Sequence, residues 1–133
     1  EIRPSGGPQR SNLVNRVGIN NKFALSAIEL MENHLADPLT LNQLAELNTI
    51  SKRQLNRIFK KYFDKGTMEY YRELRLDKAK NLLRNSSLSI AEISHMTGFY
   101  SSSHFSSLFM NYFDIPPTQY RNSSQMTYIS RLR

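Results

Sequence analysis

Residues 51–64, SKRQLNRIFKKYFD, occur a second time in altered form at residues 101–114, SSSHFSSLFMNYFD. The two stretches lie 50 positions apart, and most of the residues that they share are apolar or aromatic, including Phe59/Phe109, Phe63/Phe113 and, further along, Tyr70/Tyr120. The residues that differ are polar and lie on the opposite helical face: Lys52, Arg53, Asn56 and Arg57 are replaced by Ser102, Ser103, Ser106 and Ser107. A repeat that keeps its core and varies its surface predicts two similar modules that recognise different features.

Length and composition limit what such a pair can be. The 133 residues suit one compact domain or two very small units that share a core. The formal net charge of +7 predicts a polyanionic partner, with nucleic acid favoured over a membrane surface. The absence of cysteine excludes disulfides and thiolate metal sites and agrees with a cytoplasmic location. No apolar run approaches the roughly 18 residues of a membrane span, so we expect no membrane partner. Because the first residue is Glu1 and not Met, we expect a piece of a longer protein.

The hydrophobic spacing is helical from residue 22 to about residue 121. Residues 1–21 have no sustained period and are interpreted as an interdomain linker. From Lys22, apolar residues recur at helical spacing, and this helix is expected to end at Asp37, because the residue before a proline avoids the helical region. We expect an all-α domain over residues 22–122, which closes with a single helical turn at residues 118–121, and then an unpatterned C-terminal tail at 123–133.

Three segments have the form of a capping box, which marks the start of a helix: Thr40 with Gln43, Ser51 with Gln54, and Ser89 with Glu92. The first opens a short helix whose buried stripe is expected to be Leu41, Leu44 and Ala45, with Leu47 as a further candidate. A break at Asn48 and Thr49 leads to the basic helix of residues 51–63, so residues 22–66 predict a helix-turn-helix unit. A longer linker helix at 67–84 follows, and residues 85–122 repeat the unit. The sequence thus predicts about seven helices in two helix-turn-helix subdomains.

These residues carry a family resemblance. The segments LTLNQLAELNTISKRQLNRIFKKYF and RELRLDKAKNLL, with the closing signature GF-x4-HF-x3-F-x3-F-x2-PP-x2-YR, resemble the DNA-binding domain of the AraC/XylS family of bacterial transcription regulators. The resemblance covers residues 22–121. Upstream, the segment beginning QR and running through LVNRVGINN is similar to a subgroup in which this domain follows a class I glutamine-amidotransferase-like (PfpI-type) sensor domain.

The resemblance implies a sequence-specific duplex DNA-binding domain, with both recognition helices entering successive major-groove segments on one DNA face. It implies an activator of metabolic genes that responds to a small-molecule inducer through an N-terminal domain outside this chain. RNA polymerase is the expected protein partner, and the full-length protein is expected to be dimeric. No cofactor is expected.

The first basic helix presents candidate base contacts. Arg53, Asn56 and Arg57, at spacing i, i+3 and i+4, share one face, and arginine can pair with guanine and asparagine with adenine. In the second copy the candidates are uncharged: Ser102, Ser103, His104 and Ser106. The family usually has a basic residue where Ser107 stands, so this copy either reads bases through hydroxyl and imidazole groups or mainly positions the domain on phosphates. The candidate phosphate contacts are Ser51, Lys52, Lys60, Lys61, Ser101, Ser107 and Arg121.

Other chemistry has little support in the sequence. The histidines at 34, 95 and 104 lack paired ligand spacing, so we expect no metal site. Ser103 and His104 are adjacent without an evident orienting acid, so we expect no hydrolase and no other enzyme. The remaining alternative is a basic helical adaptor for an acidic protein, or a non-specific nucleic-acid binder. Only a specific DNA reader should keep one duplex sequence bound against a large excess of random DNA.

Overall fold

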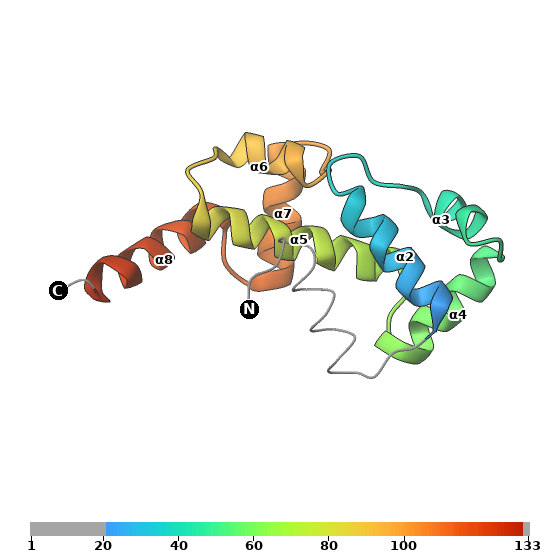
Figure 1. The fold of residues 1–133 in the computed structure, drawn as a ribbon. Helices are drawn as coiled ribbons and strands as arrows, with labels where there is room; N and C mark the ends of the chain where they lie inside the picture. The colour runs from blue at the N-terminus through green and yellow to red at the C-terminus, as the bar shows by residue number, and fades with distance from the viewer. Residues whose placement is uncertain (1–20, 132–133) are drawn as a thin grey trace. The chain divides into compact units, whose positions relative to one another are not determined.

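The computed structural model describes residues 21–131, with side chains described through residue 124, so the predicted linker lies almost entirely outside the described residues. Seven α-helices follow one another in Figure 1: α2 (Lys22–Asn33), α3 (Leu41–Leu47), α4 (Lys52–Phe63), α5 (Thr67–Asn85), α6 (Ile90–Met96), α7 (Ser102–Phe113) and α8 (Pro117–Arg131). Residues 21–131 contain no β-strand. The predicted all-α fold with two helix-turn-helix units is confirmed.

Side-chain caps begin three of the short helices at the positions that the sequence predicts. Full capping boxes are present at Thr40 with Gln43, at Ser51 with Gln54, and at Ser89 with Glu92. Each box satisfies backbone N–H groups that have no acceptor inside the helix. Local sequence is therefore sufficient to place the starts of α3, α4 and α6.

The helices pack into two compact units. The first contains residues 21–34 and 38–73, and the second contains residues 35–37 and 74–131. The long helix α5 contributes residues 67–73 to the first unit and 74–85 to the second. Each unit thus has its own helix-turn-helix pair, α3 with α4 and α6 with α7.

The first unit buries apolar side chains from all four of its helical segments: Ala24, Ala27, Ile28, Met31, Leu44, Ala45, Leu55, Phe59 and Tyr71. The Tyr71 hydroxyl donates a hydrogen bond to the carbonyl oxygen of His34 and accepts one from the N–H of Leu39 at 3.1 Å. A buried phenol thus holds both the end of α2 and the segment that leads into α3.

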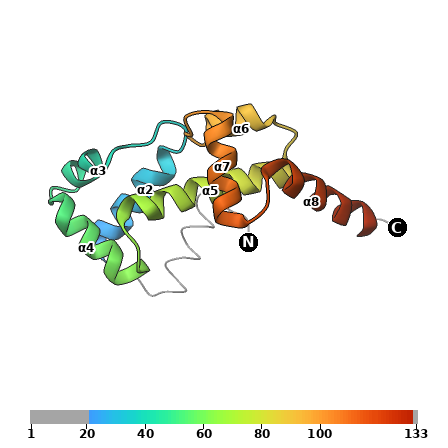
Figure 2. The ribbon, with the colours of Figure 1, turned by 180° about the vertical axis from the view of Figure 1, so that it is seen from behind.

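The second unit is built around the C-terminal half of α5, which α7 crosses in Figure 1 and, seen from behind, in Figure 2. Its buried cluster contains Leu76, Ala79, Leu83, Ile93, Phe99, Phe105 and Phe109. Tyr120 of α8 packs against this cluster. One long-range aromatic contact recurs in both units, since Phe59 lies 5.3 Å from Tyr70 and Phe109 lies 6.0 Å from Tyr120, measured between ring centroids.

Three local features differ from the prediction. Helix α2 ends at Asn33, and not at Asp37, because the His34 carbonyl is bound by the distant Tyr71 hydroxyl. Helix α8 continues to Arg131, beyond the single predicted turn, and residues 118–131 contain no proline or glycine to stop it. Leu47 is 60% exposed and does not join the buried stripe, since Leu44 and Ala45 already occupy the face of the short α3 that meets the core.

Candidate nucleic-acid interface

Helix α4 presents a basic face opposite its core contacts. Leu55 and Phe59 are fully buried, whereas the five lysines and arginines of the helix are exposed: Lys52, Arg53, Arg57, Lys60 and Lys61. The Nζ atom of Lys60 lies 4.0 Å from Oδ1 of Asp64, and both side chains are open to solvent. This surface ion pair therefore holds the lysine weakly. The face can meet a polyanion without breaking any contact of the core.

The three predicted base readers of α4 have different environments. Arg53 and Arg57 are exposed, but Asn56 is half-buried, and its Oδ1 atom accepts a hydrogen bond from the N–H of Thr67 at 3.0 Å. The amide oxygen is therefore engaged inside the unit. The i, i+3, i+4 spacing gave no sign of this contact, because Thr67 lies in the next helix.

Helix α7 presents an uncharged face in the same position of the second unit. Phe105 and Phe109 are buried. Four of the predicted contacts on the outer face are exposed: Ser102, Ser103, His104 and Ser107. The fifth, Ser106, is half-buried. The Ser101 hydroxyl caps the helix by accepting the N–H of His104 at 3.1 Å, as the Ser51 hydroxyl accepts the N–H of Gln54 at 3.0 Å. The faces thus share their framework and differ in charge.

The turns between the paired helices have a common design. Asn48 and Thr97 are buried, and each side chain donates to the carbonyl oxygen four residues back, at 2.9 Å and 2.6 Å. The next residue is left-handed in both units, Thr49 at φ 56° and Gly98 at φ 77°. The second turn is one residue longer, and its additional residue, Tyr100, is 94% exposed. This tyrosine was not among the predicted site residues, although the change of repeat offset from 49 to 50 across the turn indicates an inserted residue.

An arginine that the sequence analysis also missed holds the second turn. The Nη1 atom of Arg75, on α5, donates to the carbonyl oxygens of Gly98 at 2.8 Å and Thr97 at 3.3 Å. Its guanidinium carbon lies 4.5 Å from the centroid of the Phe99 ring. Arg75 therefore fixes the segment from which α7 begins.

Arg121 makes two hydrogen bonds within the protein, and the phosphate contact predicted for it stays a prediction. Its Nε atom donates to the carbonyl oxygen of Leu83 at 3.0 Å, and its Nη2 atom donates to that of Ser86 at 3.3 Å. These carbonyls belong to the end of α5, where a cation is favoured by the helix dipole. Two donors of this half-buried guanidinium are thus engaged within the protein.

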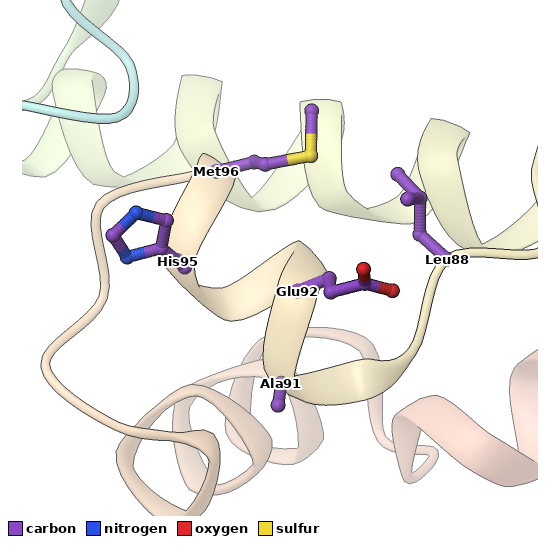
Figure 3. A pocket seen from close by; sticks show the side chains of 5 residues that line it. All are labelled: Leu88, Ala91, Glu92, His95 and Met96. Atoms are coloured by element: carbon purple, nitrogen blue, oxygen red, sulfur yellow. The ribbon is translucent and has the colours of Figure 1, made fainter.

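A shallow pocket of about 410 Å³ lies on the outer side of α6 and is lined by Leu88, Ala91, Glu92, His95 and Met96 (Figure 3). The backbone N–H of Ser89 donates to Glu92 Oε1 at 2.8 Å, and this bond, together with the Ser89 hydroxyl, holds the pKa of Glu92 below its ordinary value. Because the carboxylate already serves as a helix cap, the pocket offers no free acid beside His95.

The described residues also bear on metal binding and on membrane insertion. No cluster of three or more histidine, cysteine or acidic side chains suited to a metal ion occurs in the part of the chain that the structure describes. Within the same residues, no helix combines the length and apolar character that crossing a membrane requires.

Comparison with known proteins identifies relatives of both sequence and fold. Residues 44–123 match a family model described as a helix-turn-helix domain. The chain is 40% identical over 121 residues to the HTH-type transcriptional regulator ArgR of Pseudomonas aeruginosa, and 39% identical over 123 residues to the HTH-type transcriptional regulator GlxA of Rhizobium meliloti. These matches cover 91% and 92% of this chain but 37% and 38% of those proteins, so the chain spans just over a third of their length.

A solved structure gives the same picture. The crystal structure of an AraC-type DNA-binding-domain transcriptional regulator from Chromobacterium violaceum superposes with a TM-score of 0.73 at 39% sequence identity. The superposition covers 77% of this chain and 91% of that one.

Proposed function

This chain belongs to the family of AraC-type helix-turn-helix DNA-binding domains, and on that basis we propose that it selects a specific duplex DNA sequence through α4 and α7. The observation that carries the proposal is the exposed basic face of α4, which is held rigidly by the buried Leu55 and Phe59. A recognition helix contacts base edges through residues near its N-terminus. Arg53 and Arg57 meet that requirement, since both are exposed and lie one helical turn apart.

The contacts of α4 divide into two kinds. Arg53 and Arg57 are proposed to pair with base edges, because a guanidinium can donate two hydrogen bonds to guanine. Lys52, Lys60 and Lys61 are proposed to neutralise phosphates, which fixes the register of the helix but carries no sequence information.

The contacts of α7 are proposed to be hydrogen bonds from neutral groups. Ser102, Ser103 and His104 lie in the exposed first turn and are proposed to contact base edges, while the exposed Ser107 is proposed to contact a phosphate. Serine bonds to either donor or acceptor edges, so each hydroxyl discriminates bases less than an arginine does. We propose that α4 supplies most of the specificity.

The full-length protein is proposed to be a cytoplasmic transcription regulator, an activator of metabolic genes and not an enzyme. Its relatives are transcriptional regulators of which this chain spans just over a third, which leaves room for a sensor domain. The upstream resemblance supports a class I glutamine-amidotransferase-like domain that binds a small-molecule inducer. Dimerisation and contact with RNA polymerase are proposed as properties of that longer protein.

Selection of bound sequences from a random duplex pool tests the proposal. We expect one sequence to be enriched and to remain bound against a large excess of random DNA. Arg53→Ala and Arg57→Ala should each relax the preference at one position. Equal binding of all duplexes would indicate a non-specific nucleic-acid binder, and loss of all DNA binding would favour an adaptor for an acidic protein.

A further inference from the structure

Helices α5 and α8 begin in the same way, at matching positions of the two repeats. Each follows a recognition helix whose C-cap residue has a left-handed backbone. The carbonyl oxygen of Gly66 accepts the N–H of Tyr70 at 3.0 Å, and that of Pro116 accepts the N–H of Tyr120 at 2.9 Å. Gly66 and Pro116 are therefore the N-cap residues, and one junction is built twice.

The first residue inside each helix distinguishes the two junctions. Thr67 opens α5 and is fully buried, so its N–H, which has no acceptor within the helix, is shielded from water. The Oδ1 atom of Asn56 accepts this N–H at 3.0 Å. Pro117 opens α8 and has no N–H, so the second junction needs no acceptor at the position that corresponds to Asn56, where Ser106 stands.

Burial makes the contact between Asn56 and Thr67 costly to lose. Thr67 is fully buried, and its hydroxyl oxygen is buried with it, so this point is shielded from solvent. A buried N–H that loses its acceptor keeps the full cost of its desolvation. Asn56 therefore contributes to the fold of the first unit, regardless of what its exposed part binds.

We propose that Asn56 is a positioning residue that fixes α4 to the start of α5, a role that Pro117 makes unnecessary for Ser106 in the second repeat. The proposal rests on the DNA-binding function proposed above. An asparagine that reads adenine uses both its amide oxygen and its amide nitrogen. Because the Asn56 oxygen serves Thr67, base discrimination by α4 falls to Arg53 and Arg57.

The two junctions allow a transplant experiment on the full chain. Asn56→Ser introduces the serine found at position 106 of the second repeat but leaves Thr67, with its N–H, at the start of α5. We expect the midpoint of thermal unfolding to fall by about 4 to 8 °C, the shift expected for one lost helix cap in a domain of this size. Combining Asn56→Ser with Thr67→Pro reproduces the second junction and should recover most of the loss, because proline is favoured at the first helical position. Asn56→Asp keeps an acceptor oxygen and should retain the midpoint, as should the control Asn111→Ser at an exposed site of α7.

Binding to the selected duplex and to its single-base variants separates positioning from reading. Asn56→Ser should weaken binding to all of these duplexes by a common factor, and the double variant should restore it. If Asn56 reads a base, Asn56→Ser will change the preference at one position by about tenfold, and the double variant will not restore that preference. That result overturns the proposal.

Thermal unfolding needs no DNA, so failure of the proposed function can be distinguished from failure of this inference. A pool that yields no preferred sequence refutes specific DNA binding and leaves the positioning role to be decided by the midpoints. An unchanged midpoint in Asn56→Ser, or an equal loss in the double variant, refutes the positioning role even if the protein selects one sequence.

Discussion

Arg75 is the side chain whose removal should most clearly loosen the second helix-turn-helix. Arg75→Leu removes hydrogen bonds to two carbonyl oxygens and the contact with the Phe99 ring. Hydrogen bonds to charged groups contribute about 1.5 to 3 kcal/mol each and a cation–π contact about 0.5 to 1 kcal/mol. Arg75 is half-buried and one of its bonds is long, so water can replace part of the loss. We expect the free energy of unfolding to fall by about 2 to 4 kcal/mol.

Urea denaturation followed by circular dichroism measures this change. Arg75→Lys keeps the charge but not the planar group that spans both carbonyls and the ring, so it should lose nearly as much. Arg84→Leu, at an exposed arginine of the same helix and unit, is the matched control and should stay within about 0.5 kcal/mol of the wild type. If Arg75→Leu is no more destabilising than Arg84→Leu, the turn does not depend on the guanidinium.

Three further predictions concern the recognition helices and the cap of α6. Arg53→Ala and Arg57→Ala should each cost about 1 to 3 kcal/mol of binding free energy and relax the base preference at one position. Lys60→Ala should instead weaken binding to all duplexes alike and reduce the slope of log binding constant against log salt concentration by about 0.9. Ser102→Ala and Ser103→Ala should cost less, about 0.5 to 1.5 kcal/mol, since each removes a neutral hydrogen bond; a larger loss of discrimination than in the arginine variants would make α7 the main reader. The pKa of Glu92 is lowered from its ordinary value of 4.5, so the ionised carboxylate stabilises the fold at pH values above 4.5. This contribution is lost as the pH falls through the lowered pKa. Glu92→Gln should therefore lose less of its free energy of unfolding on acidification than the wild type, as measured by unfolding titrations.

The features that the sequence predicted correctly depend on residues close together in the chain. A capping box needs two side chains three positions apart, as at Ser51 and Gln54, and the buried face of α4 follows from the spacing of Leu55 and Phe59. The internal repeat adds the pairing of the two units, because the same apolar spacing occurs twice. These signals are sufficient for helix starts, for the core and for the outward face of each recognition helix.

The features that the sequence did not predict depend on contacts between distant residues. Tyr71 ends α2 from 37 positions away, and Arg121 reaches Leu83 from 38 positions away. Asn56 lies on the predicted face, but its amide oxygen is bound by the start of the next helix. Helical spacing states which side a residue is on, and it does not state which neighbouring backbone group approaches that side.

Comparison of α4 with α7 distinguishes two sets of residues: those that hold each helix in its unit are similar in both repeats, and those that face away from the unit differ. Both helices end in left-handed aspartates and bury two aromatic or aliphatic anchors, yet α4 carries five lysines and arginines and α7 has none. Because counterion release follows the number of phosphates that basic groups neutralise, the salt dependence contributed by the recognition helices should arise from α4. Hydrogen bonds from the serines of α7 release no counterions, so their share of the binding energy should persist as salt rises. The exposed face of either helix can therefore change its target without altering the contacts that fold the unit.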